Sequence, residues 1–220
     1  MGPHKWLLSV VLIFTGCDEQ VENSTDSPER ELSDSTATAP TEDTTPATGT
    51  FGPDNRWWHT DAAEIPPALA GTGYDIGDIA HDFTILDQHG DPVQLYQFYG
   101  QVIVLNVFVE WSYSCQDLTQ LAQEMWEDLE DDGFVYLSVM VENTDATPPQ
   151  VSDAAAWAST FGLTHPVLAD TEASQDIYAQ VAYPTLVIID RDMTIVESDF
   201  WPMDPLWIAK YVLESGTSQE

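Results

Sequence analysis

The amino-acid sequence predicts an α/β domain in which a mixed central sheet is flanked by helices. Two apolar runs rich in β-branched residues, 101–109 and 134–141, have the composition of strands that are buried on both faces. The residues between them have the apolar spacing of a helix, so the three segments predict a parallel β-α-β unit. Two further short runs, 185–189 and 194–198, are joined by a tight turn and predict an antiparallel pair at the end of the same sheet.

A β-hairpin is expected ahead of this sheet. Residues 82–86 and 93–95 are short β-like runs, and the turn-forming residues 87–90 (DQHG) separate them.

The first helix is expected to begin at Cys115 or just before it and to end at Gly133. Its apolar residues recur at helical spacing: Leu118, Leu121, Ala122, Met125, Trp126 and Leu129. The sequence predicts three more helices, over 153–161 with Ser152 as its N-cap, over 174–181, and over 204–214.

The charge balance of the chain is strongly negative. The whole sequence holds 38 acidic and 5 basic residues, and residues 57–220 hold 28 acidic residues against Arg191 and Lys210, a net charge of −26. Such a field repels phosphate backbones, which excludes a nucleic-acid-binding protein. Because the acidic residues are spread along the chain, solubility is the first explanation for them, and attraction of cationic partners is the alternative.

The start of the chain predicts a lipoprotein signal peptide over residues 1–16. An apolar run at 6–15 follows a positive charge and is too short to span a bilayer. The run ends in Phe14-Thr15-Gly16-Cys17, which resembles the bacterial lipobox, although Phe14 stands where leucine is usual. The resemblance implies cleavage before Cys17 and lipid attachment there, which would hold the protein in the cell envelope on the outer side of the inner membrane or at the outer membrane. A plain secretory signal is the alternative.

Residues 17–56 are expected to form a disordered acidic tether. The segment is rich in Thr, Ser, Pro and acidic residues and has no apolar periodicity, so it cannot bury enough surface to offset its chain entropy. The folded domain is then expected over 57–220. Trp57 and Trp58 at its start either pack the N-terminal segment onto the domain or form an exposed docking patch.

Three stretches of the domain resemble the thioredoxin superfamily, in particular its TlpA/redoxin (AhpC/TSA-like) envelope branch. Gly77–Phe83 is similar to the start of the N-terminal hairpin of that branch, with His81 where a proline is usual. Val104–Cys115 is similar to the strand that leads into the W-C-x-x-C motif, and Ala182–Thr185 is similar to the cis-proline loop. The resemblance covers about residues 76–200 and implies a thioredoxin-like fold.

The sequence departs from the family at the redox motif. Trp111 is present, but Ser112 replaces the first cysteine of the motif, and Cys115 matches the second. In the family the first cysteine attacks a substrate disulfide and the second resolves the mixed disulfide. Cys17 is the other cysteine of the chain and is expected to carry lipid, so two-cysteine exchange within the chain is excluded.

Several roles for Cys115 remain open on the sequence. The start of a helix favours a thiolate there, but Glu110 and Asp117 oppose it, and Asn106 replaces the titratable aspartate of thioredoxins. Cys115 could exchange with a small thiol or a thiol- or disulfide-bearing protein. The spacing of Ser112 and Cys115 also resembles the T-x-x-C motif of peroxiredoxins, without their proline and arginine.

The alternative is a non-catalytic module that binds extended peptides beside Pro184, with Cys115 packed and inert. The resemblance implies that a cis Tyr183-Pro184 bond presents the backbone of Tyr183 to a partner chain. The candidate site residues are therefore Trp111, Ser112, Cys115 and Pro184.

No cofactor or metal is expected. His165 precedes a proline and is interpreted as a loop residue, and His59, His81 and His89 are too scattered in sequence for a metal site. The sequence leaves the oligomeric state open.

Overall fold

The computed structural model describes residues 55–58, 63–179, 182–199 and 204–215, all within one compact unit that spans 47–220. The predicted signal peptide, Cys17 and all of the predicted tether except Asn55 and Arg56 lie outside the described residues. In the described part of the chain, none of the helices has the length and apolar character needed to cross a bilayer.

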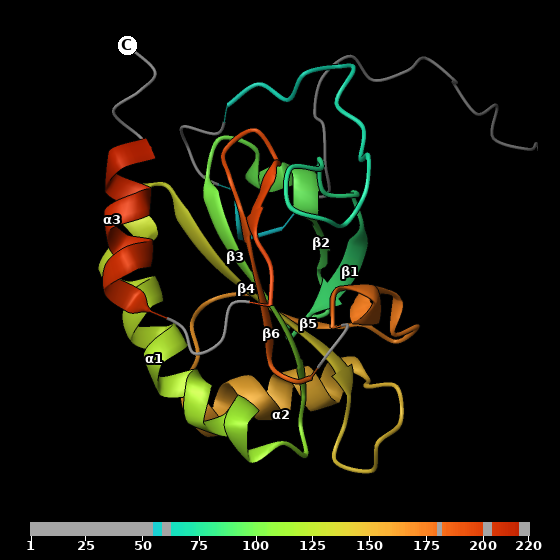
Figure 1. Ribbon diagram of the computed structural model, residues 1–220. Helices are drawn as coiled ribbons and strands as arrows, with labels where there is room; N and C mark the ends of the chain where they lie inside the picture. The colour runs from blue at the N-terminus through green and yellow to red at the C-terminus, as the bar shows by residue number, and fades with distance from the viewer. Residues whose placement is uncertain (1–54, 59–62, 180–181, 200–203, 216–220) are drawn as a thin grey trace, which may run out of the picture. The chain divides into compact units, whose positions relative to one another are not determined.

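Seven strands in the described residues form one mixed sheet in the order β2-β1-β5-β4-β3-β6-β7 (Figure 1). The strands are β1 (Thr84–Asp87), β2 (Pro92–Gln94), β3 (Val102–Val109), β4 (Phe134–Glu142), β5 (Val167–Ala169), β6 (Thr185–Ile189) and β7 (Ile195–Glu197). The central strand β3 pairs in parallel with β4 and antiparallel with β6. The predicted α/β class, the parallel unit and the N-terminal hairpin are confirmed.

The strand β5 is an element that the sequence did not predict. It pairs in parallel with β4, where Ser138 lies opposite Val167, and antiparallel with β1, where Leu86 lies opposite Ala169. The hairpin β1–β2 is thereby an extension of the central sheet. A run of three residues is too short for its periodicity to be recognised.

The described helices are α1 (Tyr113–Leu129), α2 (Val151–Phe161) and α3 (Pro205–Ser215), with three 3₁₀ helices, η1 (Leu95–Phe98), η2 (Glu130–Asp132) and η3 (Ser174–Tyr178). The crossovers β3-α1-β4 and β4-α2-β5 advance in the same direction across the sheet, so right-handed connections place α1 and α2 on the same face. α3 packs against α1, and η3 lies against β3 and β4 (Figure 1). The flanking helices are confirmed, and the ring of Tyr178 on the 3₁₀ helix η3 lies 5.1 Å from the ring of Tyr74 in the segment that precedes β1.

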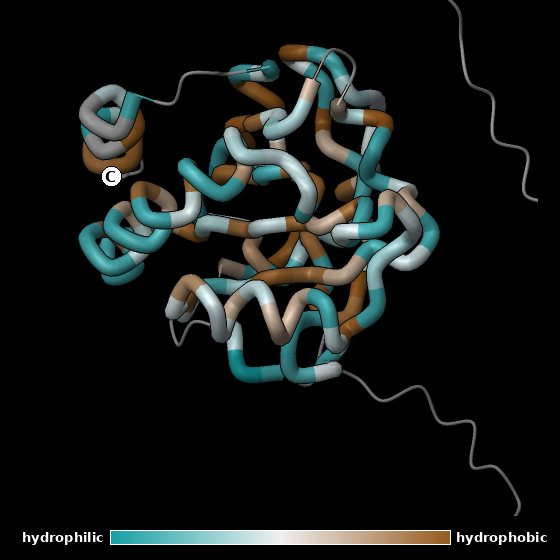
Figure 2. Tube along the Cα trace, turned by 90° about the horizontal axis from the view of Figure 1, so that it is seen from below, coloured by the Kyte–Doolittle hydropathy of each residue, from teal (hydrophilic) through white to brown (hydrophobic). Residues whose placement is uncertain are grey.

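Side-chain contacts agree with this assignment of faces. Tyr136 lies opposite Val104 in the β3–β4 ladder, so Tyr136 and Phe108 point to the same side of the sheet. On that side, the ring of Phe108 lies 5.0 Å from the ring of Trp157 on α2. Figure 2 shows hydrophobic residues gathered along the central strands and on the inward sides of the helices.

One predicted helix start, and the type and length of another predicted helix, differ from the structure. Ser152 is not the N-cap of α2: Gln150 caps it, and the carboxylate of Asp153 accepts a hydrogen bond of 2.8 Å from the Gln150 backbone N–H. The predicted helix at 174–181 is a single 3₁₀ turn that begins after Ala173, and residues 180–181 lie outside the described residues. Serine is a common N-cap residue and glutamine is not, so the sequence pattern favoured Ser152 over Gln150.

Two helical segments end at a glycine in the left-handed conformation: one is α1 with its continuation η2, and the other is α2. The two glycines differ in their surroundings. Gly133 (φ 74°) and Gly162 (φ 66°) both occupy the C-cap position that favours glycine. A Cβ atom at Gly133 would lie 2.6 Å from an Nη atom of Arg191, whereas nothing lies within 4 Å of a Cβ at Gly162.

We expect Gly162→Ala to lower the free energy of unfolding by about 1 kcal/mol, the conformational cost alone. We expect Gly133→Ala to lower it by about 2–3 kcal/mol, because the methyl group also displaces the Arg191 guanidinium. Urea denaturation of the two variants measures the difference. Equal losses would contradict a structural role for the Gly133–Arg191 contact.

Candidate functional site

The redox-motif positions lie where β3 passes into α1. The backbone N–H of Glu110 donates to the carbonyl of Glu142 at 2.9 Å, which extends the β3–β4 pairing by one residue. The chain then turns through Trp111, and Ser112 is the N-cap of α1 with extended backbone angles (φ −88°, ψ 124°). Cys115 is the third residue of the helix, so the expected helix start is confirmed.

The side chain of Ser112 points toward its neighbours on the first turn and makes no capping bond to the helix backbone. Its hydroxyl oxygen lies 3.4 Å from that of Ser114. A hydrogen bond from Ser112 to the Cys115 thiol acts to lower the pKa of that thiol. The first and fourth positions of the motif therefore both lie in the first turn of α1.

Cys115 is buried, with 2% of its surface exposed. Burial raises the pKa of its thiol, and the hydrogen bonds from Ser112 and the backbone of Val109 only oppose that shift in part. The raised pKa of Cys115 agrees with the prediction from the sequence, but its cause is burial and not the neighbouring carboxylates. The carboxylate of Glu110 instead accepts a hydrogen bond of 2.8 Å from the backbone N–H of Thr144.

The cis-proline loop lies beside the start of α1. The Tyr183–Pro184 peptide bond is cis. The rings of Trp111 and Tyr183 meet edge to face, with centroids 6.4 Å apart and an interplanar angle of 87°. Residues separated by about seventy positions in the sequence thus share one surface, and the four candidate residues Trp111, Ser112, Cys115 and Pro184 lie in or next to it.

Two aromatic side chains, Trp111 and Tyr113, are exposed on this surface. We call it the docking face and define it as Trp111, Tyr113, Tyr183 and Pro184, of which Tyr183 is partly buried and Pro184 is buried. Tyr113 is 82% exposed and Trp111 is 49% exposed. The indole N–H of Trp111 donates to Glu142 at 2.7 Å, which fixes the ring without burying it.

The hydroxyl of Tyr183 donates to Asp176. Partial burial, followed by this hydrogen bond, raises the pKa of Tyr183. Carboxylates therefore hold both Trp111 and Tyr183 at the docking face.

A groove of about 470 Å³ continues from the docking face between α1 and α2. Part of its lining is aromatic, because the ring centroids of Trp157 and Phe161 lie 4.6 Å apart, with an interplanar angle of 55°. The residues that line it are Glu110, Trp111, Tyr113, Gln116, Thr144, Ala156, Trp157, Thr160 and Phe161. The sequence analysis missed the α2 side of this groove, since Trp157 and Phe161 follow the ordinary spacing of core residues.

Buried polar side chains lie in the sheet and the loop near Cys115. The Tyr136 hydroxyl and the Asn106 side-chain oxygen are both buried, and neither has a hydrogen-bond partner within the described part of the chain. Burial, and next the nearby Cys115, raise the pKa of Tyr136. No signal in the sequence separated Tyr136 from the apolar residues of its strand.

His165 lies in the loop between α2 and β5, as predicted, but it is fully buried and its ring lies 5.1 Å from the ring of Tyr136. Burial lowers the pKa of His165 to about 4, so the ring is neutral at neutral pH. In the residues that the structure describes, no three His, Cys, Asp or Glu side chains are grouped to hold a metal ion. His59 lies outside the described residues.

Comparisons with known proteins agree with this geometry. The model of the AhpC/TSA family matches residues 76–198. The thioredoxin-like protein YneN of Bacillus subtilis is 25% identical over 119 residues, which cover 54% of this chain and 68% of YneN. The thiol-disulfide oxidoreductase ResA of Bacillus anthracis is 24% identical over 123 residues, with 56% and 68% of the two chains covered.

A solved structure shows the same fold. The thioredoxin domain of a thiol-disulfide oxidoreductase from Bacteroides vulgatus superposes with a TM-score of 0.53 at 19% identity, and the match covers 64% of this chain and 99% of that domain. More than half of this chain matches the family, and its sheet, cis-proline loop and motif helix have the arrangement described above. The chain therefore belongs to the AhpC/TSA family of the thioredoxin superfamily.

Proposed function

We propose that this chain is a lipid-anchored envelope protein whose thioredoxin-fold domain binds a partner polypeptide at the docking face, with Cys115 held as a buried thiol. The proposal rests on the residues that occupy the first and fourth positions of the redox motif. Its fourth position, Cys115, is 2% exposed, and its first position is Ser112, which cannot form a disulfide.

The anchoring part of the proposal rests on the start of the sequence. The short apolar run and the lipobox-like Phe14–Cys17 support export and lipid attachment at Cys17. The acidic, Thr- and Ser-rich residues 18–56 support a tether that separates the domain from the lipid surface.

The binding part rests on the docking face. Tyr183, which precedes Pro184, is only partly buried, and the proposal is that its backbone pairs with an extended partner chain. Trp111 and Tyr113 offer exposed apolar area beside it, and the groove between α1 and α2 continues that area. The relatives are thiol-disulfide oxidoreductases by name, so the proposed partner is a thiol- or disulfide-bearing protein.

Alkylation of Cys115 tests the proposal. In a Cys17→Ser variant, which leaves one thiol, we expect iodoacetamide to react with the native domain at least about a hundredfold more slowly than with the unfolded chain at pH 8. The expected reason is that both burial and the raised pKa withhold the thiolate. Mass spectrometry of timed samples gives the two rates.

A variant that lacks both cysteines is the control for off-target labelling. A native thiol that reacts as fast as the unfolded one, with a titration midpoint below about pH 7.5, would contradict a buried and inert Cys115.

A second function is favoured by the hydrogen bond from Ser112 to the Cys115 thiol. If a partner exposes Cys115 on binding, its thiolate attacks the partner's disulfide, forms one mixed disulfide and releases one thiolate of the partner. A mixed disulfide trapped with a disulfide-bearing peptide, and absent in Cys115→Ser, supports this function over pure binding.

A further inference from the structure

Carboxylates from three elements border the docking face. Glu110, directly after β3, lines the groove between α1 and α2. Glu142, the last residue of β4, accepts the hydrogen bond of the Trp111 indole at 2.7 Å. Asp176 of η3 accepts the hydrogen bond of the Tyr183 hydroxyl. The exposed aromatic area of the docking face is therefore edged with acidic groups.

The hydrogen bonds at these carboxylates come from neutral N–H and O–H groups, which do not cancel a negative charge. Glu110 and Glu142 are also partly buried, so water screens them less than it screens a surface carboxylate. Partial burial is the first cause of the raised pKa of Tyr183, and the hydrogen bond and charge of Asp176 and the charge of Glu142 add to it. Glu142 and Asp176 thus act on the same ring of the docking face.

Two of the basic side chains in the described residues lie toward the opposite end of the sheet. The guanidinium of Arg191 donates to the carbonyls of Gly100 and Gly133, which precede β3 and β4, whereas the docking face follows β3. The eight residues of β3 separate these two ends by about 26 Å. Lys210 is two residues from Val212 on α3, and the carbonyl of Val212 accepts a hydrogen bond from the same guanidinium.

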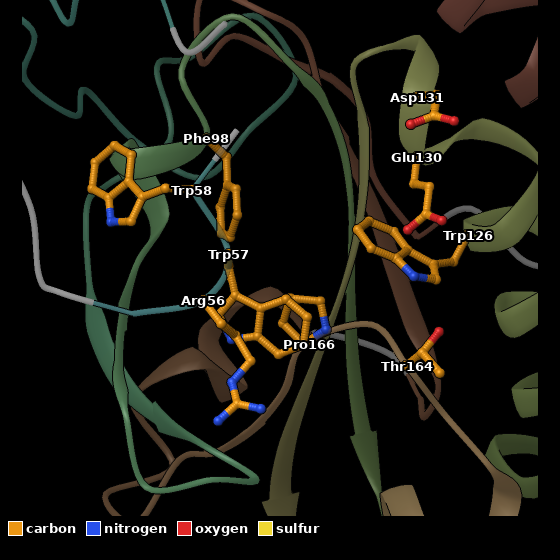
Figure 3. Close-up of a pocket in the computed structure, with 9 residues that line it drawn as sticks. All are labelled: Arg56, Trp57, Trp58, Phe98, Trp126, Glu130, Asp131, Thr164 and Pro166. Atoms are coloured by element: carbon orange, nitrogen blue, oxygen red, sulfur yellow. The ribbon is translucent and has the colours of Figure 1, made fainter. Parts of the chain in front are cut away.

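The remaining basic side chain in the described residues, Arg56, is also remote. Figure 3 shows it in a pocket whose lining includes Trp126 and Glu130, at the end of α1. The docking face lies at the start of this helix of 17 residues, so about 25 Å of helix separate the two places. In the described part of the chain, no lysine or arginine therefore offsets the carboxylates of the docking face.

We propose that the docking face selects a basic, extended segment of a partner protein, an inference that rests on the binding function proposed above. An apolar side chain of the segment packs on Trp111 and Tyr113, which are 49% and 82% exposed. A lysine or arginine beside it faces Glu110 and Glu142.

The cost of removing water from the carboxylates selects the charge of the partner. A segment that covers the docking face dehydrates Glu110 and Glu142, which is unfavourable unless a cation takes the place of the water. A neutral segment leaves this cost without compensation, and an acidic segment adds repulsion. A second copy of this chain is a poor occupant for the same reason, because its net charge is −33.

Three synthetic peptides test the proposal. They are acetylated and amidated heptapeptides with a shared Val-Ala-Val centre and with lysine, glutamine or glutamate on both sides of it. In NMR titrations of the ¹⁵N-labelled Cys17→Ser chain at constant sodium chloride concentration, we expect the lysine peptide to bind at least about tenfold more tightly than the glutamine peptide. The glutamate peptide is expected to bind most weakly. The indole N–H signal of Trp111, assigned with Trp111→Phe, is expected to shift on binding.

A pair of double variants locates the selection. Glu110→Gln with Glu142→Gln removes two charges but keeps an acceptor oxygen for the hydrogen bonds from Thr144 and Trp111. We expect it to reduce the preference for the lysine peptide over the glutamine peptide to about twofold or less.

The matched control is Asp128→Asn with Asp131→Asn, which changes the net charge equally at exposed positions near the far end of α1. It is expected to keep the tenfold preference. Circular dichroism melts check that the variants are folded, and Glu142→Gln alone, with a smaller loss of preference, serves if the first double variant is not.

The outcomes separate this inference from the function on which it rests. Equal affinity for the three peptides would overturn the selection of charge and leave the docking of polypeptides intact. Equal loss of preference in the two double variants would overturn the role of Glu110 and Glu142, since the field of the whole chain would then be the cause. No shift at Trp111 with any peptide at millimolar concentration would overturn the docking face and this inference together.

Discussion

Replacing Ser112 with cysteine is expected to give this chain the cysteine pair of a disulfide reductase and to raise its reductase activity. Ser112 is the N-cap of α1 and Cys115 is the third residue of the same first turn, so a sulfur atom at position 112 is expected to lie within reach of the sulfur of Cys115. Ser112 is partly exposed and is the N-cap of α1, where the helix dipole favours a thiolate. We expect the introduced thiol to form a disulfide with Cys115 in air, and insulin reduction with dithiothreitol to rise at least about tenfold above the parent chain.

Ser114→Cys is the matched control for this variant. It adds the same sulfur two residues further along the chain, next to Cys115, where an unstrained disulfide cannot form. It is therefore expected to stay at the activity of the parent chain. A Ser112→Cys variant that forms its disulfide, shown by mass spectrometry, but still fails to reduce insulin would contradict the proposed docking of polypeptides at Trp111 and Pro184.

Removing the Arg191 side chain is expected to give the largest loss of stability among single surface-accessible changes. Its guanidinium donates to the carbonyls of Gly100 at 2.8 Å and Val212 at 3.1 Å, and it also reaches those of Asp132 and Gly133 at 3.3 Å. One side chain thus joins the start of β3, the end of η2 and α3. We expect Arg191→Ala to lower the free energy of unfolding by about 3 kcal/mol, because several carbonyls lose a charged donor.

Thermal melts followed by circular dichroism should then show a Tm lower by about 6–12 °C. Arg191→Lys keeps the charge but not the fork of donors, so an intermediate loss is expected. Lys210→Ala is the charge-matched control, since Lys210 is exposed and its ion pair with Glu214, at 3.7 Å, is solvated. A Tm for Arg191→Ala close to that of Lys210→Ala would show that the guanidinium does not hold these segments together.

The sequence predicted the elements whose residues carry a periodic signal. The strands β3, β4 and β6 are apolar over several residues, and the spacing of α1 repeats over four turns, so both could be recognised. The strand β5 could not, because it has three residues and owes its conformation to pairing with β1 and β4 on both sides. The recognised elements are therefore determined by their local sequence, whereas β5 is determined by its tertiary contacts.

For the candidate site, the family motif predicted which residues come together but not how deeply each one is buried. The positions of Ser112, Cys115 and Pro184 follow from the motif, but the burial of Cys115 depends on packing that no single segment encodes. The second wall of the groove, Trp157 and Phe161, could not be told from core residues, because exposure on one side of a helix depends on which neighbours leave a gap.

The position of β5 has a consequence for the order in which the chain assembles. The hairpin β1–β2 emerges early during synthesis, but the strand that pairs with the free side of β1 follows only after β3, α1, β4 and α2 have been made. This edge of the sheet is therefore closed late, by contacts of long sequence separation, which form slowly. Asp87 both pairs with Leu168 of β5 and accepts the hydrogen bond of Trp57, so the position of the Trp57 ring is completed only when β5 has joined the sheet.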